Sequence, residues 1–244
     1  MTGKSPPAVT DSLAWAADGA AHLRGLMSRL GDDAFRAPSL LPGWSRAHVL
    51  SHLARNADGM INLLVWARTG VVTPAYASAE ARNADIEEGA GRTPSEIRDD
   101  VIASSDRLAT VVRDLPEAAW AALVTNVQGR VIRASAVPWI RAREMWIHAV
   151  DLDAGASFAD MPGPMVDVLL LDACEAMGRK PETPVLRLVD GDRQWHVGEA
   201  KEGTAAIVVT GEAPELAAWF LGRSKGKLLR ADGARTLPAL PPWM

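Results

Sequence analysis

The chain has 244 residues, 48% of them hydrophobic, so it can form one large domain or two modest ones with a proper core. A net charge of −4 and the lack of any Lys/Arg run argue against nucleic-acid binding by bulk electrostatics. The sequence shows no apolar segment of the kind found in secretion signals and no apolar stretch long enough to span a membrane. The single cysteine excludes an internal disulfide, which fits a reducing compartment, so we expect a cytoplasmic protein.

Four helices are predicted in the first two-thirds of the chain. Apolar residues at three-to-four spacing predict the first over about residues 11–30, and the second follows Ser45, a suitable N-cap. A capping box over residues 93–96 starts the third. The intervening segment 71–92 is long for a structureless connection, which indicates a functional or partly helical segment. Residues 124–133 predict a short hairpin before the fourth helix.

The fourth helix contains Glu144 and His148, four residues apart and therefore on one helix face, so both can bind the same ion. His52 in the second helix would complete a three-ligand metal site with open coordination positions. The apolar neighbours of the pair predict a buried helix, where a carboxylate and an imidazole need partners that a cation can supply. Asp151, one turn further on, is placed to orient the His148 ring or to face the site itself.

Three other residues each leave two interpretations open, and Arg82 is a further candidate. His48, one turn before His52, is either a fourth ligand closing the shell or, by preference, a core or helix-capping residue. Cys174 falls in the apolar stripe of its helix, which favours a buried hydrophobe over a nucleophile. Arg223, at the end of the last helix, either satisfies free carbonyls or clamps a carboxylate. Arg82 lies in the segment 71–92 and could meet an anionic ligand.

The character of the sequence changes near residue 160, where we place a domain boundary. The expected organisation is a four-helix bundle over residues 1–160, with ligands projecting inward, and a small α+β domain over residues 161–244. The second domain is expected to contain an antiparallel sheet, whose strands lie between two helices in the order of the chain. Its predicted elements are a helix over about 164–177, strands over 184–190, 193–199 and 205–211, and a helix over 214–223.

The sequence resembles the mycothiol-dependent maleylpyruvate isomerases, essentially throughout and in the same order. The segments that carry the resemblance are GWSRAHVLSHLARNADGMINLLVWARTG, AYASAEARNADIEEGA, RAREMWIHAVDLDAGASFAD and LAAWFLGR. The resemblance implies a metal-binding helical bundle of the DinB type, followed by a C-terminal domain akin to the sterol-carrier proteins (SCP2-like). It also implies that this second domain contributes to the active site.

The resemblance implies roles for individual residues as well. Three residues fall on the family's metal ligands, which usually hold zinc: His52, Glu144 and His148. Asp151 falls on the acidic position beside the metal. Arg223 falls on the arginine that the second domain supplies to bind substrate or cofactor, and Arg82 matches an arginine of the same loop.

The activity that the resemblance implies is zinc- and mycothiol-dependent cis–trans isomerisation of maleylpyruvate to fumarylpyruvate in gentisate-type aromatic catabolism. The thiolate would add reversibly to the double bond, and coordination to zinc would favour the deprotonated sulfur. Two alternatives stay open: a mycothiol S-transferase acting on another electrophile, and a non-catalytic small-molecule carrier. The expected partners are a small-molecule substrate and a low-molecular-weight thiol, and no surface marks an oligomer.

Overall fold

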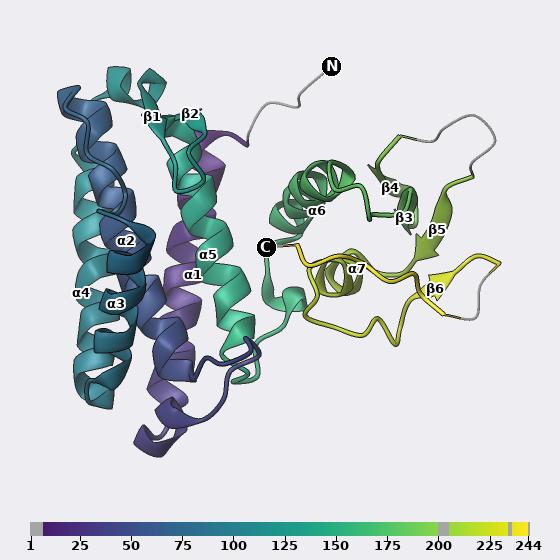
Figure 1. Cartoon of the computed structure of the whole chain (residues 1–244), viewed down its shortest axis with the longest axis horizontal. Coiled ribbons are helices and arrows are strands. Elements are labelled where there is room, and N and C mark those ends of the chain that lie inside the picture. The colour runs from purple at the N-terminus through teal and green to yellow at the C-terminus, as the bar shows by residue number, and fades with distance from the viewer. Residues whose placement is uncertain (1–6, 200–204, 234–235, 244) are drawn as a thin grey trace. The chain divides into compact units, whose positions relative to one another are not determined.

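The structure is a computed structural model that describes residues 7–199, 205–233 and 236–243. The chain divides into two compact units, Met1–Ala156 and Ser157–Met244, and each is considered by itself (Figure 1). The first unit is a helical bundle and the second combines helices with a small sheet, which confirms the predicted fold class. Within the described residues, no helix has the length and apolar character needed to cross a membrane.

The first unit is built on four long helices, with a fifth, shorter helix against α2 (Figure 1). The α-helices are α1 (Val9–Arg29), α2 (Arg46–Thr69), α3 (Ala79–Gly91), α4 (Pro94–Arg113) and α5 (Val137–Asp151). Helix α2 is central, because it packs against α3, α4 and α5, while α1 packs chiefly on α5. Short 3-10 helices cover Asp32–Arg36, Glu117–Ala121 and Ala134–Ala136, and the predicted hairpin is present as antiparallel β1 (Leu123–Thr125) and β2 (Val131–Arg133).

Local capping determines where the bundle helices begin and end. The Ser45 side chain accepts a hydrogen bond from the backbone of His48, whose ring in turn accepts from the Ser45 backbone, which closes a capping box at the start of α2. The helix ends at Gly70, whose φ of 73° places it in the left-handed region that favours glycine. Thr93 and Glu96 form the predicted capping box of α4. The segment 71–92 is partly helical, as predicted, because α3 occupies most of it.

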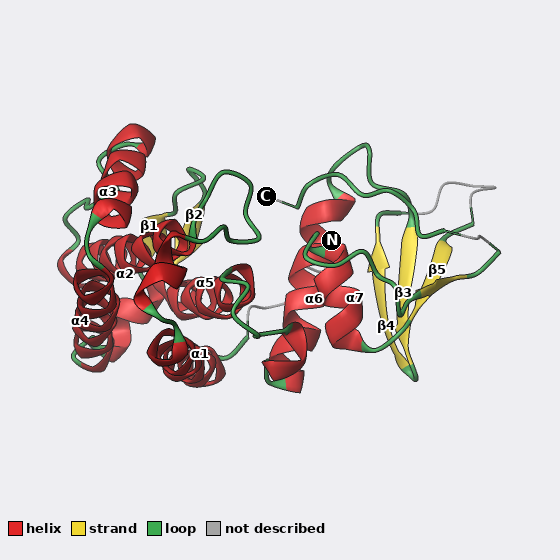
Figure 2. Ribbon diagram, turned by 90° about the horizontal axis from the view of Figure 1, so that it is seen from below, coloured by secondary structure: helices red, strands yellow, loops and turns green. Residues whose placement is uncertain are grey.

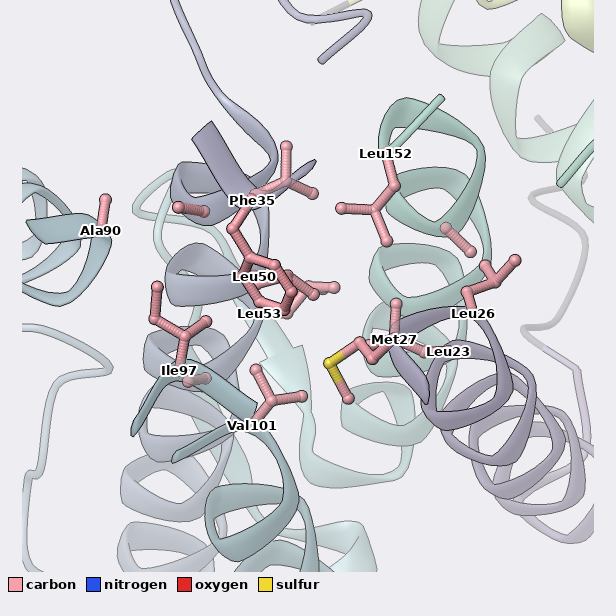
Figure 3. Close-up of a cluster of buried hydrophobic side chains, with 14 of the residues drawn as sticks. Leu23, Leu26, Met27, Phe35, Leu50, Leu53, Ala90, Ile97, Val101 and Leu152 are labelled. Carbon is pink, nitrogen blue, oxygen red and sulfur yellow. The ribbon is translucent and has the colours of Figure 1, made fainter. Parts of the chain in front are cut away.

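Buried apolar residues surround the parts of α2 and α5 that carry the candidate ligands. Leu50 and Leu53, which flank His52 in α2, are fully buried beside Leu23 of α1 and Leu152 at the end of α5 (Figure 3). Because His52 and its neighbours lie on a helix buried on several sides, the backbone that carries this imidazole is held by packing rather than by a loop.

In the second unit, two helices cover one face of a four-stranded sheet (Figure 2). Its helices are α6 (Gly163–Gly178) and α7 (Ala213–Phe220), with a short 3-10 turn at Phe158–Asp160, and its strands are β3 (Leu186–Asp190), β4 (Arg193–Val197), β5 (Ile207–Thr210) and β6 (Arg230–Ala231). The predicted likeness of this unit to sterol-carrier domains stays a prediction.

The expectation of an antiparallel sheet was wrong for one pair of strands. The order is β4-β3-β5-β6, and β5 runs parallel to β3, with Leu186 opposite Ile207. After the β3–β4 hairpin the chain is back at the end of the sheet where β3 began. Because β5 joins the free edge of β3 from that same end, it must run in the direction of β3. Strand β6, which the sequence pattern missed, has only two residues.

Candidate metal centre

Three side chains from two helices converge inside the first unit. His52 projects from α2, while Glu144 and His148 project from α5, and one ligand atom from each lies within 4.8 Å of the other two. Oε2 of Glu144 is 2.8 Å from Nε2 of His52 and 3.3 Å from Nε2 of His148. The two imidazole rings meet edge to face, with their centroids 4.7 Å apart. We call this set the ligand cluster.

Helix geometry and packing explain why these three residues meet. Glu144 and His148 lie one turn apart on α5, so their side chains share a face. The rest of that helix is buried nearly all round, with Met145, Trp146 and Ile147 all in the core. Since α2 and α5 pack against each other, the face of α5 that carries the two ligands meets the face of α2 that carries His52.

Asp151 orients one of the imidazoles. This carboxylate is wholly buried at the C-terminal end of α5, and its Oδ2 lies 2.8 Å from Nδ1 of His148. A proton on Nδ1 of His148 is therefore held by Asp151, which leaves Nε2 facing Glu144. This is the arrangement in which a second carboxylate fixes the tautomer of a metal-binding histidine.

The charges of the ligand cluster are set by burial and by mutual hydrogen bonding. Burial alone would raise the pKa of the Glu144 carboxyl, but hydrogen bonds to His148 and His52 outweigh it and hold this pKa well below its usual value. Burial lowers the pKa of His52, against the opposing effect of Glu144. For His148, burial is outweighed by Asp151 and Glu144, which raise its pKa to about 9.

Two residues of the segment before and within α3 lie next to the cluster. Nη2 of Arg82 lies 2.9 Å from Nδ1 of His52, so this predicted residue reaches a candidate ligand directly. The guanidinium carbon of Arg82 also stands 5.7 Å from the centre of the Tyr76 ring. Sequence reasoning missed Tyr76, because an isolated aromatic residue in a connection forms no pattern. Its one sequence signal is that it is the single tyrosine and lies in the segment 71–92, whose length indicates a functional or partly helical stretch.

The structure gives the remaining candidates other contacts, each within its own unit. His48 caps α2 and its Nε2 lies 3.2 Å from Glu87, so the capping interpretation is the one observed. Cys174 is buried in α6 as expected, and burial raises the pKa of its thiol to about 12. Arg223 belongs to the second unit, where its Nη1 donates to the carbonyl of Leu221 just after α7.

The donor set fits a divalent transition metal. Two imidazole nitrogens and one carboxylate oxygen are the ligands of open zinc sites, and such a site leaves positions for further ligands. All three side chains are largely buried, which keeps competing water away from their donor atoms. The fold and this cluster together define the class: a helical-bundle protein with a candidate three-ligand metal centre between two of its helices.

Comparison with known proteins identifies the family. Residues 16–153 match the family model of the mycothiol maleylpyruvate isomerase N-terminal domain. The solved structure of the mycothiol-dependent maleylpyruvate isomerase is 32% identical, with a TM-score of 0.90, over 96% of this chain and 97% of that one. The structure of its H52A mutant gives a TM-score of 0.89 with the same identity and coverage. The chain therefore belongs to the mycothiol maleylpyruvate isomerase family.

A more distant structure shares the fold alone. YfiT from Bacillus subtilis, which has an unusual four-helix bundle topology, is 14% identical, with a TM-score of 0.51, over 63% of this chain and 88% of that one. No curated protein matched the sequence.

Proposed function

We propose that this protein converts maleylpyruvate to fumarylpyruvate, a cis-to-trans change about a carbon–carbon double bond, with zinc and mycothiol as cofactors. The observation that carries the proposal is the ligand cluster, in which three donors lie within 4.8 Å of one another in a chain of this family. His52, Glu144 and His148 would hold the zinc ion. When bound there, zinc supplies a Lewis acid beside which the mycothiol thiol loses its proton at neutral pH, and the resulting thiolate can add reversibly to the conjugated double bond.

The residues around the cluster prepare it for a cation. Asp151 holds the Nδ1 proton of His148, so the Nε2 lone pair of that ring is available to an ion once the ring is neutral. Glu144 stays ionised in the buried site, because its pKa is held well below the usual value. The cluster thus contributes one negative charge and two imidazole nitrogens from rigid helices.

The chain offers no available thiol of its own for the addition. Its one cysteine, Cys174, is buried, and the raised pKa of about 12 keeps the thiol protonated at neutral pH. A nucleophilic sulfur must therefore come from outside, which supports a low-molecular-weight thiol as the cofactor.

Arginines would bind the carboxylates of the substrate. Arg82 is half-buried beside His52, and no carboxylate among the described residues pairs with it. Its guanidinium can therefore bind a carboxylate by donating two parallel hydrogen bonds to it. Arg223 is the second proposed carboxylate-binding residue, as the resemblance to the family implies.

The test is to follow the absorbance of maleylpyruvate with zinc-loaded protein, with and without a catalytic amount of mycothiol. We expect loss of maleylpyruvate only with mycothiol, fumarylpyruvate as the product, and full recovery of the thiol. Metal-free protein is the control and should be inactive. Stoichiometric consumption of mycothiol would instead establish an S-transferase, and binding without turnover would favour a carrier.

A further inference from the structure

Tyr76 stands beside the ligand cluster without belonging to it. Together with Arg82, this tyrosine lines a cavity of about 340 Å³ bounded by α2, α3 and the segment that joins them. Arg82 connects the cavity to the cluster, because its guanidinium lies over the Tyr76 ring and also contacts His52. A molecule in this cavity would therefore contact Tyr76 and Arg82, and Arg82 in turn contacts the candidate metal ligand His52.

Helix α2 makes room for the phenol. A Cβ at Gly59 would lie 3.1 Å from Cζ and 3.2 Å from the hydroxyl oxygen of Tyr76, closer than ordinary contacts. Gly59 lies two turns after His52 on the same face of the helix. Glycine inside a helix costs about 1 kcal/mol relative to alanine. The helix that carries His52 thus bears this cost at the point where the hydroxyl end of Tyr76 needs space.

The hydroxyl of Tyr76 is a hydrogen-bond donor that the described residues do not use. Burial raises the pKa of this phenol, against the opposing effect of Arg82, so the hydroxyl keeps its proton at neutral pH. No acceptor among the described residues takes that proton, and Arg82 cannot, because a guanidinium has donors only. Half-buried donors of this kind are usually satisfied by a ligand or by water.

The other charged residues of the cavity are paired, except for the exposed Asp85. Arg55 binds Asp100 at 2.7 Å, and Arg92 binds Glu88 at 2.8 Å. Of the remaining lining acids, Asp58 is held by Arg55 and Arg107, and Asp85 is exposed to solvent. Arg82 is therefore the lining cation that has no carboxylate partner within the described part of the chain.

We propose that Tyr76 is a substrate-binding residue, whose hydroxyl joins the guanidinium of Arg82 in donating hydrogen bonds to one carboxylate of the bound substrate. The two oxygens of a carboxylate can accept from both donors at once, and the charged donor strengthens the pair. The inference rests on the proposed function for the identity of the substrate. It adds a residue that lies outside the ligand cluster and to which the resemblance assigned no role.

The first experiment compares Tyr76→Phe with Thr73→Val in the zinc-loaded protein. The phenylalanine variant keeps the ring against Gly59 and removes the hydroxyl alone. Thr73 lies in the same segment, and its hydroxyl donates to the Val71 carbonyl. We expect kcat/KM of Tyr76→Phe to fall about tenfold or more, as for one lost hydrogen bond to a charged group. Bound zinc and Tm should stay unchanged, and Thr73→Val should match the wild type. Unchanged kcat/KM in Tyr76→Phe overturns the proposal.

The second experiment does not depend on turnover. Because the chain has one tyrosine, protein labelled with ¹³C at tyrosine Cζ gives a single phenol resonance. Titration of zinc-loaded protein with maleate, an unreactive dicarboxylate, should shift this resonance, and Arg82→Met should abolish or weaken the shift. A resonance that maleate leaves unmoved overturns the proposal. If the protein fails to isomerise maleylpyruvate but the shift occurs, the proposed function fails and the carboxylate contact stands.

Discussion

Arg82 donates a hydrogen bond from Nη2 to Nδ1 of His52 across 2.9 Å, which links α3 to the candidate metal ligand of α2. Because a guanidinium has no acceptor, Nδ1 of His52 must be the acceptor. The single proton of a neutral ring is then on Nε2, where it points to Oε2 of Glu144 at 2.8 Å. A metal ion can bind Nε2 only after that proton has left. A neutral His52 ring then carries its proton on Nδ1, which can no longer accept the hydrogen bond from Arg82.

Arg82 should therefore weaken metal binding. In Arg82→Met, both the competing hydrogen bond and the repulsion between a guanidinium and a divalent ion are gone. We expect the zinc Kd to fall about tenfold, equivalent to about 1.4 kcal/mol, measured by competition with a chelating dye. Turnover should drop, because the variant lacks an arginine that is proposed to bind a carboxylate of the substrate. Arg24→Met, which removes a surface arginine paired with Asp106, is the control. Equal or weaker zinc binding by Arg82→Met would show that the two contacts do not compete.

His52→Ala should abolish stoichiometric zinc binding and activity, since it leaves two of the three donors. His48→Ala is the matched variant on the same helix. It should lose only part of the cap of α2, about 1 kcal/mol of stability, and keep its zinc. Metal analysis after dialysis, together with thermal unfolding, distinguishes the two. Zinc loss in His48→Ala would favour the closed four-ligand site, and full activity in His52→Ala would reject the site assignment.

Asp151→Asn should weaken zinc binding by about 10- to 100-fold, the usual effect of removing a carboxylate that orients a ligand histidine. The side chain keeps its shape, but the negative charge behind His148 is lost. Asp153→Asn is the control, because this residue is exposed and its φ of 49° is one that asparagine tolerates. A zinc Kd equal to that of the wild type would mean that Asp151 serves only the fold.

Zinc affinity should rise with pH up to about 9. In the metal-free protein the pKa of His148 is raised to about 9, so at neutral pH zinc must displace one proton from this ring. Below pH 9 the zinc Kd should fall about tenfold for each unit by which the pH rises. Calorimetry at pH 7.5 in buffers of different ionisation enthalpy should report the release of about one proton. Affinity that is flat between pH 6.5 and 8.5 would contradict this.

The same group should affect the stability of the metal-free protein in the opposite direction. In the folded protein the pKa of His148 lies above its ordinary value of 6.5. Its contribution to the free energy of unfolding is therefore fully present below pH 6.5 and is lost as the pH rises through about 9. Zinc-saturated protein should not show this loss, and thermal unfolding of both forms across the range makes the comparison.

Arg223→Ala should keep its zinc but lose turnover, if the arginine binds a carboxylate as proposed. Loss of the bond from Nη1 to the Leu221 carbonyl contributes about 1 kcal/mol to the expected fall in stability. Arg230→Ala, at an exposed arginine of the same unit, is the control and should leave kcat/KM unchanged. Zinc loss in Arg223→Ala would mean that the residue has a structural role instead.

Features that depend on residues close together along the chain could be predicted from the sequence. The starts of α2 and α4 could be predicted at Ser45 and Thr93, because a cap is a contact between residues three apart. The pairing of Glu144 with His148 was predictable for the same reason, since one helical turn places both on one face. These are short-range consequences of backbone geometry, which the surrounding protein rarely overrides.

Features that depend on packing between distant segments could not be predicted from local patterns. His52 and Glu144 are 92 residues apart, and they meet because α2 and α5 bury their apolar faces against each other. The contacts of Arg82 and Tyr76 depend on how α3 lies on α2, which no local pattern encodes. The direction of β5 was mispredicted because it depends on which edge of β3 the chain reaches after the hairpin. Burial on these surfaces, rather than any local preference, selects one arrangement among the many that the same helices and strands allow.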